Sequence, residues 1–158
     1  MIQALIPTED TVRRLARSLL GGGRAGRAGA AGGPEVRPVD KDARMAWWVG
    51  TRYVLRLAPD REAAVRQRRE LRLRELVRPH VPVAVPASAA RGEWAPGLPC
   101  TLDVRLRGGP ADAHEVSAVG ETDLAGLLGG LREVPVRQAE ALGVPRSAPR
   151  SLEALRRA

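Results

Sequence analysis

The chain has 158 residues, a length that suits a single domain with its own hydrophobic core. Its formal net charge of +8 comes from 26 basic residues, but only one of these is a lysine, and they are scattered among 18 acidic residues. Arginine and alanine are abundant throughout, while phenylalanine and asparagine are absent, as GC-rich coding would impose on any protein. The charge therefore does not indicate a surface selected for nucleic acid.

Cysteine and histidine usage excludes further classes of protein. A single cysteine, Cys100, cannot form an intrachain disulfide or a cysteine-based metal site. His80 and His114 have no companions at metal-ligand spacing. No apolar run is long enough to cross a membrane, and no basic segment followed by an apolar one opens the chain, so we expect a cytoplasmic protein without a membrane partner.

The first predicted element is a helix within residues 1–20. Thr8 is a good N-cap, and acidic residues follow it, where they favour a helix N-terminus. Apolar residues then recur at helical spacing. Residues 21–34 are almost entirely glycine, alanine and arginine, which predicts a flexible linker. Residues 35–40 can form an edge strand, because Pro38 limits its pairing.

A hairpin is predicted next, from residues 45–49 and 53–57, with Gly50 in its turn. In the second strand Tyr53, Leu55 and Leu57 share one face, and Val54 and Arg56 share the other. Arg56 is thus a cation among apolar neighbours, and a buried charge is costly unless it meets an anion.

A long helix follows over residues 61–78 and ends at Pro79. Glu70 lies in line with Ala63, Leu73 and Val77 on this helix, so its carboxylate interrupts an apolar stripe. We expect Arg56 and Glu70 to face one another. A structural ion pair, or an arginine whose head reaches solvent at a sheet edge, explains the same spacing.

The rest of the chain predicts shorter elements. Residues 81–86 alternate with proline and form an extended connector into a strand at residues 87–90, followed by a loop over residues 92–99 that contains Trp94. Residues 100–106 read as another strand. Thr122 then caps a helix that ends at Pro135, with Leu124, Leu127, Leu128 and Leu131 on one face.

The order and local sequences of these elements resemble the aminoglycoside phosphotransferase family of kinase-like enzymes. The resemblance rests on Trp47-Trp48-Val49-Gly50, Tyr53-Val54-Leu55-Arg56-Leu57, Arg69-Glu70 and the proline-rich connector. It continues through Leu98-Pro99-Cys100-Thr101-Leu102 and the helix that begins at Asp123. It implies an α+β fold: a protein-kinase-like N-lobe over residues 35–107, and the first helix of a truncated C-lobe within residues 108–158.

The resemblance also implies site residues. In kinases a strand cation holds the nucleotide phosphates and pairs with a helix glutamate. By position, Arg56 would be that cation, Glu70 its partner, and Val54 a roof for the adenine ring. A hinge at residues 103–106 would place backbone groups of Val104 and Leu106 against adenine.

Departures from the family pattern limit the activity expected of this chain. The turn that should lie over the phosphates, residues 40–46, contains no glycine. The family's His-Gly-Asp motif, its following asparagine and its magnesium-binding aspartate have no counterpart. We therefore expect weak ATP binding, no magnesium ligands and no turnover by this chain. The parent reaction would phosphorylate a hydroxyl of a small molecule with ATP.

Two alternatives stay open. The chain could be a non-catalytic kinase-like module that binds a nucleotide or a partner protein through its open lower face, where self-association is also expected. It could also be a basic nucleic-acid-binding domain, which a steep dependence of affinity on salt would reveal.

Overall fold

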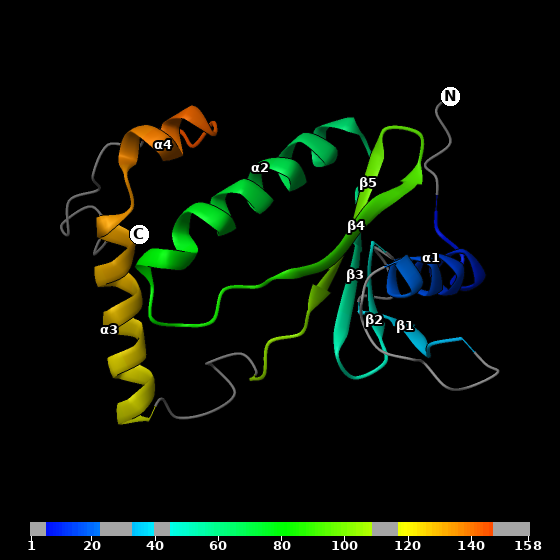
Figure 1. Ribbon diagram of the computed structural model, residues 1–158, viewed down its shortest axis with the longest axis horizontal. Helices are drawn as coiled ribbons and strands as arrows, with labels where there is room; N and C mark the ends of the chain where they lie inside the picture. The colour runs from blue at the N-terminus through cyan, green and yellow to red at the C-terminus, as the bar shows by residue number, and fades with distance from the viewer. Residues whose placement is uncertain (1–5, 23–32, 40–44, 109–116, 147–158) are drawn as a thin grey trace, which may run out of the picture.

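The computed structural model describes residues 6–22, 33–39, 45–108 and 117–146. One five-stranded sheet lies between α1 on one side and α2 on the other, and α3 and α4 lie beyond α2 (Figure 1). The elements in chain order are α1 (Glu9–Gly22), β1 (Val36–Pro38), β2 (Ala46–Val49), β3 (Tyr53–Leu57), α2 (Arg61–Val77), the 3-10 turn η1 (Arg78–His80), β4 (Ser88–Ala95), β5 (Leu98–Val104), α3 (Ala118–Glu133) and α4 (Val136–Ala141). Most of the predicted linker, most of the turn at residues 40–46 and residues 147–158 lie outside the described part of the chain.

The sheet has the strand order β1-β2-β3-β5-β4, and every neighbouring pair is antiparallel. The predicted hairpin is confirmed as β2 and β3. Its turn uses Gly50 at φ 55°, a left-handed conformation that glycine adopts without strain. Trp48 pairs with Val54 across the hairpin, and Ala46 pairs with Arg56. Because side chains alternate along a strand, Trp48, Val54 and Arg56 share one face of the sheet.

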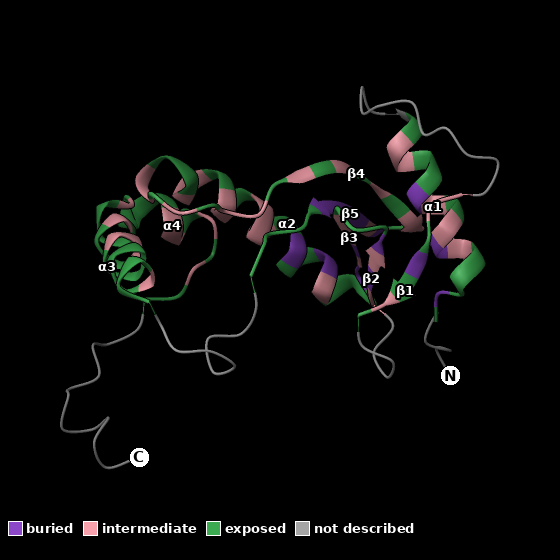
Figure 2. Cartoon of the chain, turned by 90° about the horizontal axis from the view of Figure 1, so that it is seen from below, coloured by how far each residue is buried: buried purple, intermediate pink, exposed green. Residues whose placement is uncertain are grey.

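The opposite face of the sheet carries the hydrophobic core, closed by α1. Thr8 caps this helix as predicted, since its hydroxyl accepts from the amide of Thr11 at 3.3 Å. Val12 and Ala16 are fully buried against the sheet. The buried sheet residues in this core are Val36, Trp47, Val49, Leu55, Leu57, Cys100 and Leu102. Figure 2 shows buried residues on the sheet, on α1 and on the first half of α2.

The face of α2 that meets the sheet differs from the predicted apolar stripe. Its buried residues are Ala64 and Gln67, whereas Ala63, Leu73 and Val77 are only partly buried. Gln67 donates from its amide nitrogen to the Thr101 hydroxyl at 3.2 Å. The part of the sheet that α2 meets carries Arg56, Thr101 and Asp103, so polar side chains of the helix, rather than an apolar stripe, turn toward it.

The strand predicted at residues 87–90 is present as β4, but it is longer than expected, and the loop predicted at residues 92–99 is wrong. β4 continues through Trp94 to Ala95, and β5 begins at Leu98, so the two strands form a long hairpin. Gly97, at φ 75°, supplies the tight turn between them. The indole nitrogen of Trp94 donates to the Ala58 carbonyl oxygen at 2.9 Å, which ties the hairpin to the end of β3.

The N-cap of the helix expected at Thr122 lies five residues earlier. Ser117 is its N-cap, and its hydroxyl accepts from the Gly120 amide at 3.2 Å. Thr122 lies inside α3 and donates back to the Ala118 carbonyl oxygen at 3.0 Å. α4 was not expected from the sequence: its N-cap is Pro135, the residue expected only to end the preceding helix.

Two glycines let α3 approach the chain that leaves α2. A Cβ added at Gly130 would lie 2.1 Å from the His80 carbonyl oxygen, and one at Gly126 would lie 2.8 Å from Cγ of Pro82. Gly129 has no neighbour within 4 Å of such an atom. The close approach thus requires glycine at two positions and leaves the third unconstrained.

Candidate functional site

The predicted pairing of Arg56 and Glu70 is confirmed. The two terminal nitrogens of Arg56 donate to the two carboxylate oxygens of Glu70 at 2.7 and 2.8 Å. β3 places the arginine on the sheet face that looks toward α2, and the helix places the glutamate directly opposite. A bidentate arginine–carboxylate contact fixes the plane of the guanidinium as well as its position.

A second arginine–carboxylate pair extends this contact into a closed ring. Arg74, one turn after Glu70 on α2, donates to both Glu70 and Asp103. Asp103 lies on β5, where one oxygen accepts from Arg74 at 2.8 Å and the other from the Ser88 hydroxyl at 2.7 Å. Arg56 lies 3.7 Å from the same aspartate. We call these four side chains, Arg56, Glu70, Arg74 and Asp103, the ion ring.

Local spacing predicted half of this ring, Arg56 and Glu70, but it gave Asp103 no role beyond the start of the hinge. The signal that it lacked was the register between β3 and β5, in which Val54 pairs with Asp103. That register brings Asp103 to the same face as Arg56.

The contact between Arg56 and Glu70 favours the charged form of both side chains. Hydrogen bonds from Arg56, and then its positive charge, lower the pKa of Glu70 against the opposing effect of burial. The hydrogen bond to Glu70 raises the pKa of Arg56 in turn. Arg56 therefore remains a cation, and it is held in one orientation while Glu70 is ionised.

The predicted base-binding residues lie along one end of the sheet. Val54 is on the same face as Arg56, next to Trp48. The amide of Val104 donates to the Ala87 carbonyl oxygen at 2.8 Å, so that N–H group is already used. Of the predicted hinge contacts, the Val104 carbonyl and the backbone of Leu106 remain as predictions.

A hollow of about 530 Å³ opens beside these residues, between the β2–β3 turn and the end of β5. It is lined by Thr51, Arg52, Val104, Arg105, Leu106, Arg107 and Gly108. The amide of Arg105 donates to the Arg52 carbonyl oxygen at 2.8 Å, and this bond fixes the backbone of the two segments that line the hollow. The lining carries cationic side chains and no carboxylate, so this hollow favours anionic or electron-rich ligands.

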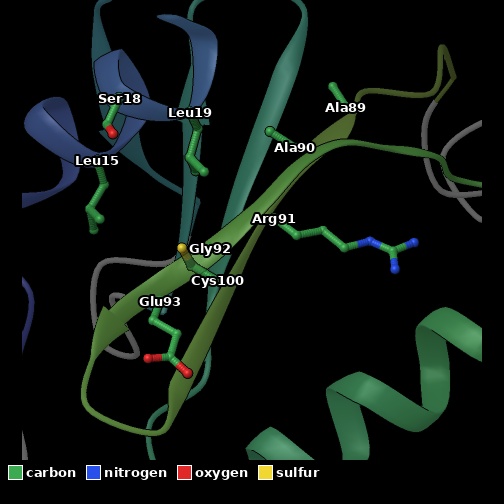
Figure 3. A pocket seen from close by; sticks show the side chains of 9 residues that line it. All are labelled: Leu15, Ser18, Leu19, Ala89, Ala90, Arg91, Gly92, Glu93 and Cys100. Carbon is green, nitrogen blue, oxygen red and sulfur yellow. The ribbon is translucent and has the colours of Figure 1, made fainter. Parts of the chain in front are cut away.

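A second hollow, of about 520 Å³, lies on the core side of the sheet between α1 and the β4–β5 hairpin. Leu15 and Leu19 approach from α1, and Cys100 lies on the strand side (Figure 3). Arg91 extends away from α1 toward α2, where it pairs with Glu75 at 2.6 Å. Burial raises the pKa of the Cys100 thiol to about 11, so it stays protonated and unreactive near neutral pH. The thiol of this hollow is therefore not a candidate nucleophile.

No three histidine, cysteine, aspartate or glutamate side chains gather into a possible metal site in the described part of the chain. The two carboxylates of the ion ring are already engaged by arginines. None of the described helices is long and apolar enough to span a membrane.

Comparison with known proteins places these features in a family context. Residues 35–158 match the family model described as the phosphotransferase enzyme family, APH. The solved structure of the GDP and kanamycin complex of APH(2")-IIia is similar, with a TM-score of 0.55 and 21% sequence identity. The match covers 72% of this chain and 41% of that chain. No curated protein matches the chain. The likeness concerns the fold, and the kinase-like fold expected from the sequence is confirmed.

Proposed function

Because the chain belongs to the phosphotransferase enzyme family and has its kinase-like fold, we propose that it binds a nucleoside triphosphate on the side of the sheet that faces α2. The observation that carries this proposal is the bidentate contact between Arg56 and Glu70. A cation fixed in one plane by a helix carboxylate is the arrangement that orients nucleotide phosphates in kinase-like folds.

Arg56 keeps donors for such phosphates. Each terminal nitrogen of a guanidinium carries two N–H groups, and the contact with Glu70 uses one on each side. The remaining N–H groups point away from the carboxylate. A phosphate oxygen there would accept charge-assisted hydrogen bonds, and arginine neutralises its charge at every working pH.

The base would lie toward the end of β5. Val54 lies between Arg56 and that end of the sheet and would cover one face of a purine ring. The Val104 carbonyl oxygen and the backbone of Leu106 would provide polar contacts along its edge. These base-binding groups lie beside the sheet face that carries Arg56, so one extended ligand can reach both the base-binding groups and the arginine.

The parent reaction that we propose is transfer of the terminal phosphoryl group to a hydroxyl of a small molecule. The similar solved protein binds GDP and kanamycin, which supports a nucleotide together with a small-molecule acceptor. This sequence has no asparagine, and His80 and His114 are followed by valine and glutamate rather than by Gly-Asp. With no metal-binding cluster among the described residues, we propose that this chain alone transfers no phosphoryl group.

Isothermal titration with ATP tests the nucleotide site. Arg56→Ala should weaken ATP binding by about tenfold or more, because one charge-assisted phosphate contact is lost. Arg91→Ala is the matched control: it removes one arginine from the same sheet face, but from an exposed pair with Glu75. Equal ATP affinity in the wild type and in Arg56→Ala would refute the proposal.

Measuring ADP release in the presence of ATP, magnesium and kanamycin tests the proposal that this chain alone transfers no phosphoryl group. We expect no release above background from this chain. Turnover would show that catalytic groups exist that the family pattern does not identify.

The exposed leucines of α3 favour association with a partner through this face. Leu124, Leu128 and Leu131 are 53%, 56% and 42% exposed, and α3 has no buried residue. We propose that the face self-associates when no other partner covers it. Sedimentation at increasing concentration should show a dimer or larger species in the wild type and a monomer in Leu128→Glu; a wild-type monomer at every concentration would contradict this.

A further inference from the structure

Trp48 presents its indole on the same sheet face as Val54, its partner across the hairpin. The side chain is only partly buried, although it is a large aromatic group in the middle of a strand. The guanidinium carbon of Arg105 lies over this ring, 4.3 Å from its centroid. Arg37 approaches the same ring less closely, at 6.0 Å.

Arg105 is held by its backbone and by its contact with Trp48 rather than by an ion pair. Its amide bond to Arg52 fixes the start of the side chain, just after the end of β5. Among the described residues, no carboxylate forms an ion pair with its guanidinium, unlike Arg56 and Arg74. The residue is exposed. Stacking on Trp48 is therefore the contact that keeps this side chain over the sheet face.

We infer that Arg105 covers a base-stacking surface on Trp48, and that a bound nucleotide base takes its place. This inference rests on the proposed nucleotide site. The base must lie near Val54 to be continuous with phosphates at Arg56, and Trp48 is the aromatic side chain adjacent to Val54. At 4.3 Å the guanidinium is in direct contact with the ring, which leaves no space for a base between them.

The base and Arg105 would compete because both would stack on the same face of the indole. The exchange is feasible because the two stacking contacts differ in strength. Leaving a cation–π contact at an exposed site costs about two- to fivefold in affinity. Stacking a base on an aromatic side chain gains about five- to a hundredfold. The base therefore displaces Arg105, but with an affinity lower than an uncovered Trp48 would give.

Titration of the full chain with ATP and with inorganic tripolyphosphate tests this inference. Arg105→Ala should tighten ATP binding about two- to fivefold, whereas tripolyphosphate binding should not improve, because it has no base. Arg107→Ala, the exposed arginine two residues later in the same hollow, is the control for loss of one charge and should not tighten ATP binding. Trp48→Leu should weaken ATP binding without weakening tripolyphosphate binding.

The double variant Trp48→Leu/Arg105→Ala decides whether the two residues act through one another. If Arg105 acts by covering the indole, its removal should no longer tighten ATP binding once Trp48 is absent. Weaker ATP binding in Arg105→Ala would overturn the inference, since the arginine would then support the base rather than compete with it.

The same measurements separate failure of this inference from failure of the nucleotide site. If Arg56→Ala binds tripolyphosphate as well as the wild type does, or if ATP does not bind at all, the proposed site is wrong and the inference fails with it. If Arg56→Ala weakens both ligands but Trp48→Leu leaves ATP affinity unchanged, only the inference is wrong. Thermal unfolding of each variant verifies that it is folded before titration.

Discussion

Replacing Asp103 by asparagine should destabilise the protein far more than an ordinary surface substitution. The aspartate side chain is 6% exposed, and that of Arg74 is 14% exposed. Asp103→Asn keeps the size of the side chain and an oxygen for Ser88, but it removes one of the two negative charges of the ion ring. Two arginines would then share only Glu70.

The expected loss follows from burial of the pair. Breaking a buried ion pair typically costs about 3–5 kcal/mol, whereas an exposed pair is worth about 0–1 kcal/mol. Asparagine still accepts hydrogen bonds, and Glu70 is partly solvated, so we expect about 2–3 kcal/mol, below the fully buried range. This would be a large share of a total stability of about 5–15 kcal/mol.

Urea unfolding monitored by tryptophan fluorescence measures this loss. With a slope of about 2 kcal/mol per molar, the midpoint should fall by about 1–1.5 M. Glu75→Gln is the matched control, because it removes a carboxylate from an arginine pair in which both side chains are 54% exposed. We expect that control to lose much less stability than Asp103→Asn, because an exposed ion pair is screened by solvent. If Asp103→Asn loses no more than Glu75→Gln, the ion ring is a surface feature and the reasoning from burial fails.

Three further predictions follow from other contacts. Gly130→Ala should destabilise the fold by about 1–3 kcal/mol, because the added Cβ would meet the His80 backbone. Gly129→Ala should stabilise the fold by about 0.5–1 kcal/mol, because alanine has the higher helix propensity. Thermal midpoints of the two variants that move in the same direction would contradict this. Because Cys100 is buried, it should react with a thiol reagent only on unfolding, and rapid labelling of the native protein at pH 8 would refute its burial. Its pKa, raised to about 11, means that the thiol contributes its full stability below the pKa of the unfolded thiol and loses it as pH rises toward 11. Because the pKa of Glu70 is lowered in the folded protein, this residue should stabilise the fold above its unfolded pKa, and that stability should be lost as pH falls through the folded pKa. Glu70→Gln should therefore flatten the acid side of the curve of stability against pH. An unchanged curve would contradict the link between Glu70 ionisation and folding.

Local periodicity was sufficient to predict the centre of the candidate site. Strand alternation placed Arg56 on the face opposite Leu55, and the position of Glu70 on the next helix suggested its partner. Both signals are short in sequence, and one loop joins the two elements. Asp103 lies 47 positions after Arg56 in the chain, and its place beside that arginine depends on strand pairing, which no local pattern encodes.

The errors in the predicted fold arose where turn-forming residues lie inside regular structure. Gly92 suggested a loop, but it lies within β4, where a Cβ would come 3.2 Å from a Leu19 methyl carbon, so α1 packs closely against the strand at this position. Thr122 suggested a helix start because threonine is a good cap, yet its hydroxyl bonds back within α3. In both cases a tertiary contact or an internal bond accounts for a residue that local propensity assigns to a turn or an end.

The packing of α1 has a practical consequence for anyone who expresses this protein from a shortened gene. The family match begins at residue 35, which invites a cut at that point. Such a cut would remove Val12 and Ala16, both fully buried, and leave the apolar side of the sheet bare to water. We expect the shortened protein to accumulate as insoluble aggregates, so an expression boundary is better placed before Pro7 than at the edge of the sequence family.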